Sequence, residues 1–269
     1  PKPAVRNSNK DGVRMVSGRN TVDLNSDVGE RASALLDGSE EQLLRLVSSA
    51  NIACGGHAGD AASMKAVVTM CLACGVSIGA HPGFPDRARF GRTKIDIPAS
   101  KLEASVREQV ESLLDISAGI GATVRHVKPH GALYNAASKD RLFAEIIANA
   151  ISSVDRNLVL VGLAGSLMLD VWRSAGFAVV GEAFADRRYE PDGTLRSRSL
   201  GDALITNPDD AATQAGGIVC DGVVVAVDGS RLTVRAQTIC IHSDTENAIA
   251  LASRIRAHLL GAGVTIEPF

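Results

Sequence analysis

Short runs rich in apolar and β-branched residues alternate along the chain with longer segments in which apolar positions recur at helical spacing. The short runs are typical of strands, and the longer segments are typical of amphipathic helices. The predicted strands occupy 21–25, 49–53, 76–80, 123–128, 158–162, 178–184 and 237–242. The predicted helices occupy 40–49, 60–74, 99–117, 138–153, 165–175, 207–219 and 244–260. Strands that alternate with helices in this way indicate a parallel sheet with right-handed crossovers.

Side chains on the two faces of the predicted strands differ in polarity. Because alternate residues of a strand share a face, Asp23 and Asn25 lie on one face and their apolar neighbours on the other. His126 and Lys128 share a face in the same way, although Arg125 falls among the apolar positions. An open doubly wound sheet needs two apolar faces, whereas a barrel needs one apolar face under its helices. The pattern therefore favours an irregular seven-stranded parallel β/α barrel, a fold of the α/β class.

Two segments depart from the repeat of strand and helix. Residues 185–206 are polar and predict a long loop over the mouth of the barrel, while 223–236 alternate around an Asp-Gly pair as in a β-hairpin. We expect one barrel domain over 20–269, with the hairpin as a small insertion. The polar and basic residues 1–19 predict a flexible extension, and they lack the apolar segment of a signal peptide.

Composition and charge narrow the classes of partner. The 269 residues carry a net charge of −2 and only 3% aromatic side chains, which argues against nucleic-acid binding and against attachment to an anionic membrane. No apolar run reaches the roughly 20 residues that cross a bilayer. Five cysteines, an odd number, argue against a disulfide framework. We therefore expect a cytoplasmic protein.

Polar motifs gather where predicted strands end, which is where parallel β/α folds place their active sites. Carboxylates and imidazoles can exchange protons, and lysine and arginine can hold carboxylates or phosphates. The candidate catalytic residues are Asp23, Asp27, His57, His81, Lys128, His130 and His242. The candidate substrate-binding residues are Asn25, Asn51, Arg92, Asp186 and Arg187. The candidates for a supporting or helix-capping role are Asp60, Asp186 and Asp244.

The same residue types leave other chemistries open. Three histidines with an aspartate can bind Zn²⁺ or another divalent cation, but no H-E-x-x-H motif is present, so we expect no tightly bound metal. Cys54 is either a nucleophile or a small residue in a tight turn. Cys71 and Cys74 have redox spacing, but they fall at the end of a predicted helix, which favours core packing. The G-x-x-x-x-G-K-[ST] motif that binds nucleotide phosphates is absent from the sequence.

Eight motifs follow one another along most of the chain: VDLNSDVGE (22–30), NIACGGHAGD (51–60), GAHPGFPD (79–86), FGR (90–92), VKPHGALYN (127–135), EAFADRRY (182–189), DGTL (192–195) and TICIHSD (238–244). Together they resemble the LamB/YcsF family. Three positions depart from it: Ser26 stands where the family usually has Cys, Gly56 where it has Phe, and Ser243 where it has Gly. None of the acid–base positions is replaced, and Ser26 indicates that no thiol is essential there.

The resemblance implies a barrel akin to that of the polysaccharide deacetylases and a role as the A subunit of a 5-oxoprolinase, with partner subunits B and C. Such a complex converts 5-oxoproline to glutamate with ATP and magnesium, and the missing phosphate-binding motif fits a nucleotide site partly or wholly on the partners. In this hypothesis a carboxylate or imidazole activates water. Lys128 and an arginine hold the substrate carboxylate or the phosphorylated lactam, and Lys128 pairs either with Asp23 or with the substrate.

Two other functions remain open at this point. One is a stand-alone, metal-dependent hydrolase that acts on amides or carbohydrates as deacetylases do. The other is a non-catalytic subunit that binds a lactam. Assays of the chain alone and with its partners would separate these three hypotheses.

Overall fold

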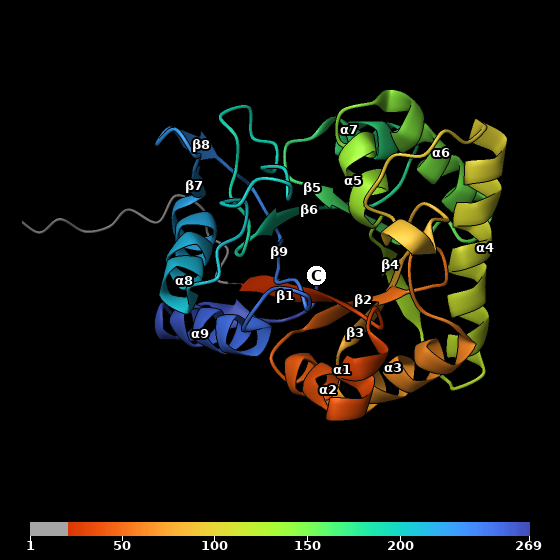
Figure 1. The fold of residues 1–269 in the computed structure, drawn as a ribbon, viewed down its shortest axis with the longest axis horizontal. Coiled ribbons are helices and arrows are strands. Elements are labelled where there is room, and N and C mark those ends of the chain that lie inside the picture. The colour runs from red at the N-terminus through yellow and green to blue at the C-terminus, as the bar shows by residue number, and fades with distance from the viewer. Residues whose placement is uncertain (1–20) are drawn as a thin grey trace, which may run out of the picture.

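The computed structural model of this chain describes residues 21–269, and the extension predicted over 1–19 lies outside the described residues. Seven parallel strands form a closed barrel, because β1 pairs with β2 on one side and with β9 on the other (Figure 1). The barrel strands are β1 (Thr21–Val28), β2 (Ser49–Ala53), β3 (Ser77–His81), β4 (Val124–Val127), β5 (Val159–Leu163), β6 (Val179–Phe184) and β9 (Thr238–Cys240). This closure confirms the predicted barrel and excludes the open doubly wound sheet.

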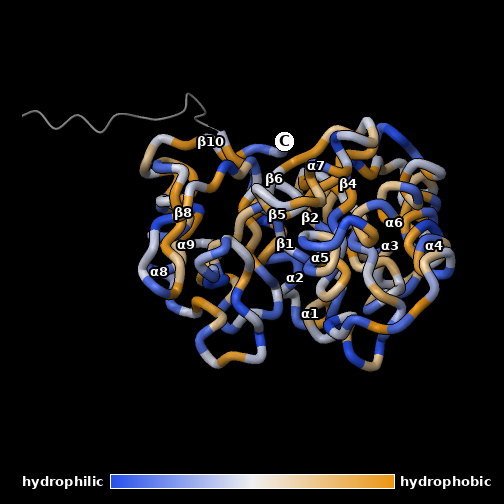
Figure 2. Tube along the Cα trace, turned by 90° about the horizontal axis from the view of Figure 1, so that it is seen from above, coloured by the Kyte–Doolittle hydropathy of each residue, from blue (hydrophilic) through white to orange (hydrophobic). Residues whose placement is uncertain are grey.

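Helices cover the outside of the barrel (Figure 1). They are α1 (Ala32–Asp37), α2 (Ser39–Leu44), α3 (Ala61–Cys74), α4 (Ala99–Ala118), α5 (Gly131–Ala137), α6 (Arg141–Ser152), α7 (Leu167–Ser174), α8 (Pro208–Gly216) and α9 (Ala248–Gly261). Apolar strand residues such as Leu24, Ile52 and Val127 are fully buried in the core, while Arg125 is exposed. Hydrophobic and hydrophilic positions mix along the helices, as expected for elements with one face on the core (Figure 2).

Three helical regions differ most from the prediction, and each follows the end of a strand. The short helices α1 and α5, which the sequence pattern missed, begin at Ala32 after β1 and at Gly131 after the β4 motif. Helix α9 begins at Ala248 rather than at 244. The residues before it form turns instead, because the Thr245 hydroxyl donates a hydrogen bond to Asp186 (2.8 Å) and Arg31 donates one to the Ser243 carbonyl (2.7 Å).

The two departures from the β/α repeat are confirmed. Strands β7 (Val223–Val225) and β8 (Arg231–Thr233) pair antiparallel and form the predicted hairpin. Residues 185–206 contain no helix or strand, and part of this loop lines the cavity described below. The mouth of the barrel is therefore bordered by a long loop as well as by strand ends.

The opposite end of the barrel is covered by the C-terminal segment. Strand β10 (Thr265–Ile266) pairs with the first residues of β1, and the ring of Phe269 lies 5.2 Å from that of the inward-facing His126. The open end is thus the one at which the parallel strands finish. Between residues 21 and 269, no helix has both the length and the apolar character needed to cross a membrane.

The interior of the barrel is polar, as the strand pattern predicted. Asp23 accepts hydrogen bonds from the hydroxyls of Ser48 and Ser49, both at 2.7 Å, and from that of Thr238. Burial nevertheless raises the pKa of Asp23 above its ordinary value. Each of these polar groups is buried, so the network fixes the side chains that form the floor of the mouth.

Candidate active site

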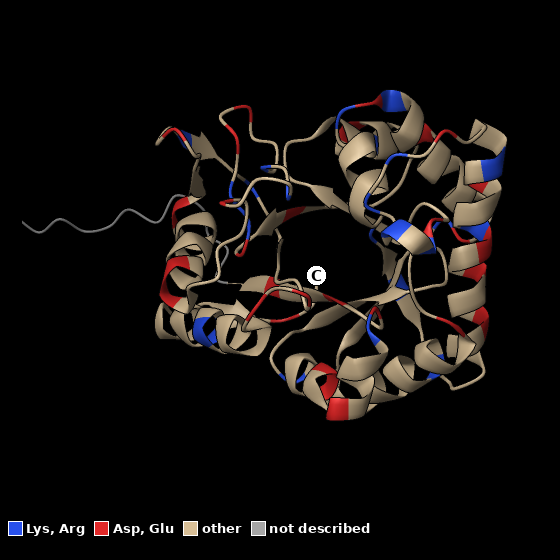
Figure 3. Cartoon of the chain, in the orientation of Figure 1, with Lys and Arg blue, Asp and Glu red and all other residues tan. Residues whose placement is uncertain are grey.

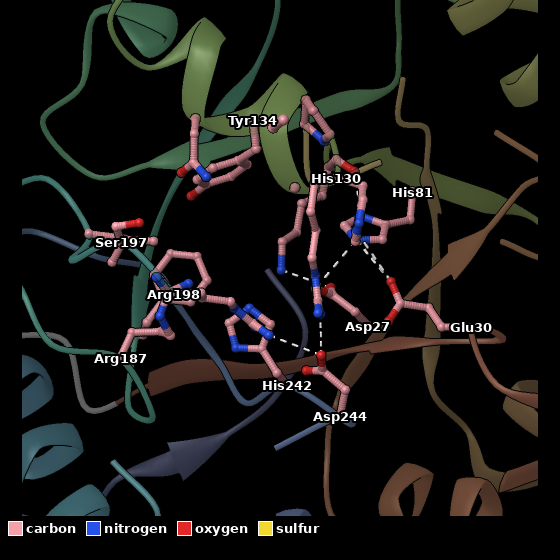
Figure 4. Close-up of a pocket in the computed structure, with 18 of the residues that line it drawn as sticks. Asp27, Glu30, His81, His130, Tyr134, Arg187, Ser197, Arg198, His242 and Asp244 are labelled. Carbon is pink, nitrogen blue, oxygen red and sulfur yellow. Dashed lines mark hydrogen bonds and ion pairs between the residues drawn. The ribbon is translucent and has the colours of Figure 1, made fainter. Parts of the chain in front are cut away.

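A cavity of about 340 Å³ opens at the carboxyl ends of the strands (Figure 4). Its volume lies at the lower end of the range of roughly 300–1,000 Å³ that is usual for small-molecule sites. The predicted site residues that line it are Asp27, His81, Arg92, Lys128, His130, Arg187, His242 and Asp244. The sequence analysis thus located the mouth of the barrel correctly as the place where its motifs meet.

Lys128 forms the floor of this cavity. Its ammonium lies 2.9 Å from Asp27 Oδ1 and 2.8 Å from Glu182 Oε1, and only 2% of the residue is exposed. Burial would lower the pKa of Lys128, but the two carboxylates outweigh it and raise the pKa well above its ordinary value. The expected partner Asp23 was wrong, because that carboxylate lies deeper in the barrel and is held by hydroxyls.

Three predicted site residues lie below the cavity and do not line it: Asp23, Asn25 and Asn51. The amide of Asn25 donates to Glu182 (3.0 Å), and that of Asn51 donates to Asp27 (2.9 Å). The expectation that these residues face the mouth was therefore wrong. Strand parity placed them inside the barrel correctly, but it cannot say how far along the barrel axis a side chain lies.

One side of the mouth is a cluster of imidazoles around a carboxylate, which we call the histidine wall: Glu30, His57, His81 and His130. Glu30 Oε1 lies 3.0 Å from His57 Nε2, 3.2 Å from His130 Nδ1 and 3.9 Å from His81 Nε2. His130 Nδ1 and His81 Nε2 are 3.0 Å apart. His57 does not line the cavity, but its ring stacks on that of His130 with centroids 3.5 Å apart.

The histidine wall combines buried imidazoles with an ionised carboxylate. Burial lowers the pKa of His57 to about 3 and also lowers that of His130. Burial alone would raise the pKa of Glu30, but its contacts with His130 and His57 outweigh this effect and hold the pKa below its usual range. At neutral pH the two imidazoles are therefore neutral and the carboxylate is ionised.

Glycines after β3 let the chain pack closely around these imidazoles. A Cβ atom on Gly91 would lie 2.8 Å from the Cβ of His57, and one on Gly83 would lie 3.0 Å from His57 Nδ1. Gly91 also has a φ of +60°, which other residues rarely adopt. The GAHPGFPD and FGR motifs thus supply both a histidine and the loop that fixes the neighbouring rings.

The other side of the mouth carries guanidinium groups, and we call it the arginine wall: Arg92, Arg187 and Arg198. Figure 4 shows Arg187 and Arg198 across the cavity from His81 and His130, and Figure 3 shows Lys and Arg on loops that border the opening. Asp244 binds Arg198 at 2.9 Å and also contacts Arg92. Two of the three arginines therefore already have a carboxylate partner.

Arg187 is the exception on this wall. It is only 5% exposed, its Nη2 donates to the carbonyl of Arg196 at 2.6 Å, and it forms no ion pair within residues 21–269. Its Nε is buried without a hydrogen-bond partner among the described atoms. Burial and the nearby charge of Arg198 lower the pKa of Arg187 to about 10, so it stays charged at neutral pH. A buried cation without a counterion next to a cavity is a binding position for an anion.

Asp186 supports the site from behind and does not line the cavity, so its predicted contact with substrate is wrong. It accepts from the backbone N–H of His242 at 2.9 Å and lies 3.0 Å from the imidazole Nδ1 of the same residue. Burial would raise the pKa of Asp186, but the contacts with His242 outweigh it and lower the pKa to about 2. Asp60, the other supporting candidate, caps α3 away from the cavity.

Four residues of the site were missed by the sequence analysis: Glu30, Tyr134, Glu182 and Arg198. Glu30, Tyr134 and Glu182 stand inside the quoted motifs, so only their roles were overlooked. Glu182 is a carboxylate in the middle of a predicted strand and is fully buried, with the Tyr134 hydroxyl donating to it at 2.8 Å. An acidic residue at the centre of a barrel strand was the available signal. Arg198 gave none, because its loop has no regular pattern.

The cysteines lie outside this chemistry. Cys54 is buried and does not line the cavity, and burial raises the pKa of its thiol to about 12, which argues against its being the nucleophile. Cys71 is buried in the core and Cys74 is half-buried at the end of α3. The core-packing interpretation of this pair is supported.

A closed parallel β/α barrel with acid–base groups and arginines around one small cavity defines the class as a β/α-barrel enzyme. Within that class the chain belongs to the LamB/YcsF family, which it matches over residues 22–269. The A subunit of 5-oxoprolinase from Chloroflexus aggregans is 47% identical over 247 residues, which cover 92% of this chain and 98% of that protein. The protein of the same name from Neisseria meningitidis serogroup A is 44% identical over 91% of this chain and 98% of its own length.

Solved structures agree with this assignment. The lactam utilization protein from Thermus thermophilus superposes with a TM-score of 0.86 and 42% sequence identity, over 93% of this chain and 100% of that one. A Streptomyces plicatus N-acetyl-β-hexosaminidase has a TM-score of 0.50 at 11% identity, over 95% of this chain and 64% of that one. The second likeness concerns the barrel fold alone.

Proposed function

We propose that this chain is the A subunit of a 5-oxoprolinase that opens 5-oxo-L-proline to L-glutamate with MgATP, in a cytoplasmic complex with subunits B and C. Relatives with 44–47% identity over more than nine-tenths of the chain are named as the A subunit of 5-oxoprolinase. The similar Thermus protein is named for lactam utilization. Both names fit a ligand that combines a cyclic amide with a carboxylate.

The observation that carries the proposal is the buried Arg187, which has no ion-pair partner among residues 21–269 and lies across the cavity from the histidine wall. In 5-oxoproline a carboxylate lies on one side of a five-membered ring and the lactam carbonyl on the other. A carboxylate bound to Arg187 would satisfy the guanidinium. The lactam would then point toward Asp27, His81 and His130, which are the acceptors that face the cavity.

The overall reaction needs ATP because lactam hydrolysis is otherwise unfavourable. The lactam oxygen displaces ADP from the γ-phosphorus, and water then adds to the lactam carbon. The C–N bond breaks as the ring nitrogen takes up a proton, and a further water releases phosphate from the resulting acyl phosphate. The sequence has no P-loop. We therefore place the nucleotide site partly or wholly on subunits B and C.

The residues of this chain serve the water-addition step. A water on the cavity side of Asp27 gives its proton to that carboxylate as it attacks. Lys128 holds Asp27 and Glu182 in place, since it contacts both carboxylates. The ring of Phe184 stacks on that of His242 and closes the floor between the two walls.

The decisive experiment measures glutamate and ADP from 5-oxoproline and MgATP, with this chain alone and with subunits B and C added. We expect turnover only in the mixture. Turnover by the chain alone would contradict the division of labour. A mixture that releases no glutamate would contradict the proposed function.

The same assay tests the two other functions. If the chain binds a lactam without taking part in catalysis, the complex that contains Asp27→Asn retains turnover, whereas a catalytic role predicts a loss of at least about a hundredfold. If the chain is a stand-alone deacetylase-like hydrolase, it releases acetate from N-acetylated substrates without ATP or partners.

A further inference from the structure

We propose that Glu30, His81 and His130 form a binding site for one divalent transition-metal ion at the edge of the cavity, with His57 as the residue that positions Glu30. The absence of an H-E-x-x-H motif predicted no tight metal site, and that expectation rests on spacing along the chain alone. The proposal rests instead on how three separate strand ends bring these donor atoms together. It does not depend on the proposed reaction.

The first support is the hydrogen-bonding state of the two imidazoles. His81 Nδ1 lies 2.7 Å from the carbonyl of Lys128, and His130 Nε2 lies 2.9 Å from the carbonyl of Phe90. Because a carbonyl only accepts, both of these ring nitrogens carry the proton. The lone pairs of a neutral imidazole are then on His81 Nε2 and His130 Nδ1, which face each other at 3.0 Å.

Two facing lone pairs and a carboxylate oxygen leave three acceptors with no donor between them. Glu30 Oε1 completes the triangle at 3.2 Å from His130 Nδ1 and 3.9 Å from His81 Nε2. Such a group needs either an additional proton or a cation at its centre. The backbone carbonyls behind both rings are the usual outer partners of metal-binding histidines, since they fix the tautomer and the ring orientation.

The second support is the size of the triangle. With sides of 3.0, 3.2 and 3.9 Å, a point equidistant from the three atoms lies about 2.0 Å from each, which is the usual length of zinc–nitrogen and zinc–oxygen bonds. The rings of His81 and His130 are nearly perpendicular, at 87°, so one ion can lie near the planes of both. The donor atoms therefore already have the spacing of a coordination site.

His57 has a different role because its ring is parallel to that of His130, with an interplanar angle of 3°. An ion in the plane of one ring would lie well out of the plane of the other. Its Nε2 lies 3.0 Å from Glu30 Oε1 and is placed to donate a hydrogen bond to that carboxylate. His57 is therefore a positioning residue that orients Glu30.

The donor set selects the class of ion. Two imidazole nitrogens and one carboxylate oxygen suit Zn²⁺, Co²⁺ or Fe²⁺, whereas Mg²⁺ and Ca²⁺ prefer oxygen ligands alone. Glu30, His81 and His130 all line the cavity, so the ion would keep an open position toward it, as catalytic zinc sites do. Asp27 Oδ2, 3.3 Å from His81 Nε2, is placed to interact with whatever occupies that position.

The test uses the chain alone, stripped with a chelator and titrated with ZnCl₂ by calorimetry and with CoCl₂ by visible absorption. We expect one ion per chain, a cobalt spectrum typical of low coordination number, and no competition from millimolar MgCl₂. Glu30→Gln and His130→Gln should each weaken Zn²⁺ binding at least about a hundredfold, and His57→Gln about 10- to 100-fold. The matched control His242→Gln, an imidazole of the same cavity outside the triangle, should bind Zn²⁺ as the parent chain does.

Absence of zinc binding to the parent chain in the micromolar range would overturn the proposal. So would binding that survives Glu30→Gln and His130→Gln while His242→Gln abolishes it. If a variant fails to fold, anomalous diffraction from zinc-soaked crystals of the parent chain decides the question. A peak between His81 Nε2 and His130 Nδ1 supports the site, and a peak elsewhere or none contradicts it. No arm requires ATP, substrate or partners, so failure here is distinct from failure of the proposed reaction.

Discussion

The histidine wall and the arginine wall face each other across one cavity, yet they are built in opposite ways. The histidine wall stands on the ends of β1, β3 and β4 and the turn after β2, and its side chains hold one another at 3.0–3.9 Å. The arginine wall draws mainly on the loop over 185–206, and its most buried member, Arg187, has no counterion among the described residues.

This difference separates preorganisation from recognition. Side chains that already hold one another fix the reacting atoms in place before a ligand arrives. A buried charge without a partner costs stability in the free protein and is compensated by a ligand of opposite sign. Substitutions on the preorganised side should therefore reduce stability, whereas substitutions on the arginine side should reduce binding.

The largest effect is expected at Lys128, under the histidine wall. Lys128→Met leaves the buried carboxylates of Asp27 and Glu182 without a cation, which should cost about 3–5 kcal/mol of the free energy of unfolding. For a domain of this size that is a fall of roughly 10 °C in the melting temperature. Calorimetry measures it, with the exposed Lys101→Met as the control. An unchanged melting temperature would show that the two carboxylates take up protons or other partners.

The opposite result is expected for Arg187→Met. The substitution removes a buried charge that has no ion-pair partner in the described part of the chain, so the melting temperature should stay the same or rise. Loss of the carboxylate contact should lower kcat/KM for 5-oxoproline in the full complex about a hundredfold, mainly through KM. Its exposed neighbour provides the control, since Arg188→Met should change neither quantity. A fall in stability without a change in KM would assign Arg187 to the structure of the loop.

Acid should weaken the stabilising contact between Asp186 and His242, behind the cavity. Its pKa is about 2 in the folded chain, below the ordinary value of 3.8, so the ionised carboxylate stabilises the fold above about pH 4. That contribution, roughly 2–3 kcal/mol, is lost as the pH falls from about 4 to about 2. The difference in unfolding free energy between the parent chain and Asp186→Asn should shrink over this window. A constant difference would mean that the interaction with His242 does not depend on the charge of Asp186.

The sequence predicts the barrel and the histidine wall better than it predicts the arginine wall. The strands can be predicted because alternation of polar and apolar residues is local. The closed barrel can be predicted because each strand has one polar face, such as that of Asp23 and Asn25, and one apolar face. The histidines of the mouth are readable because strand ends converge. The depth of a side chain along the barrel axis cannot be predicted from the sequence, since it depends on the stagger between neighbouring strands. The pairing of Lys128 with Asp27 and Glu182 instead of Asp23 is an example.

The loop of the arginine wall is the part that sequence pattern could not resolve. Arg187 follows a strand and was predicted, but Arg198 lies in an irregular segment whose path is set by contacts distant in sequence. One such contact joins Arg198 to Asp244, which are 46 residues apart. The predicted start of α9 was too early for a related reason. The residues between β9 and α9 form turns whose side chains contact the loop of the arginine wall, so the helix begins after them.

The smallest effect is expected for an exposed ion pair of the arginine wall, between Arg92 and Asp244. Arg92 follows the β3 motif and Asp244 follows β9, so their ion pair bridges the mouth. The side chain of Arg92 is 41% exposed, and exposed ion pairs contribute about 0.2–1 kcal/mol. Arg92→Ala should therefore raise KM for 5-oxoproline no more than about fivefold, with kcat and the melting temperature little changed. A double-mutant cycle with Asp244→Ala measures the coupling, which should weaken as ionic strength rises. A loss of a hundredfold or more in Arg92→Ala, retained at high salt, would instead mean that Arg92 itself contacts the substrate, and the arginine wall would then hold two anion-binding positions rather than one.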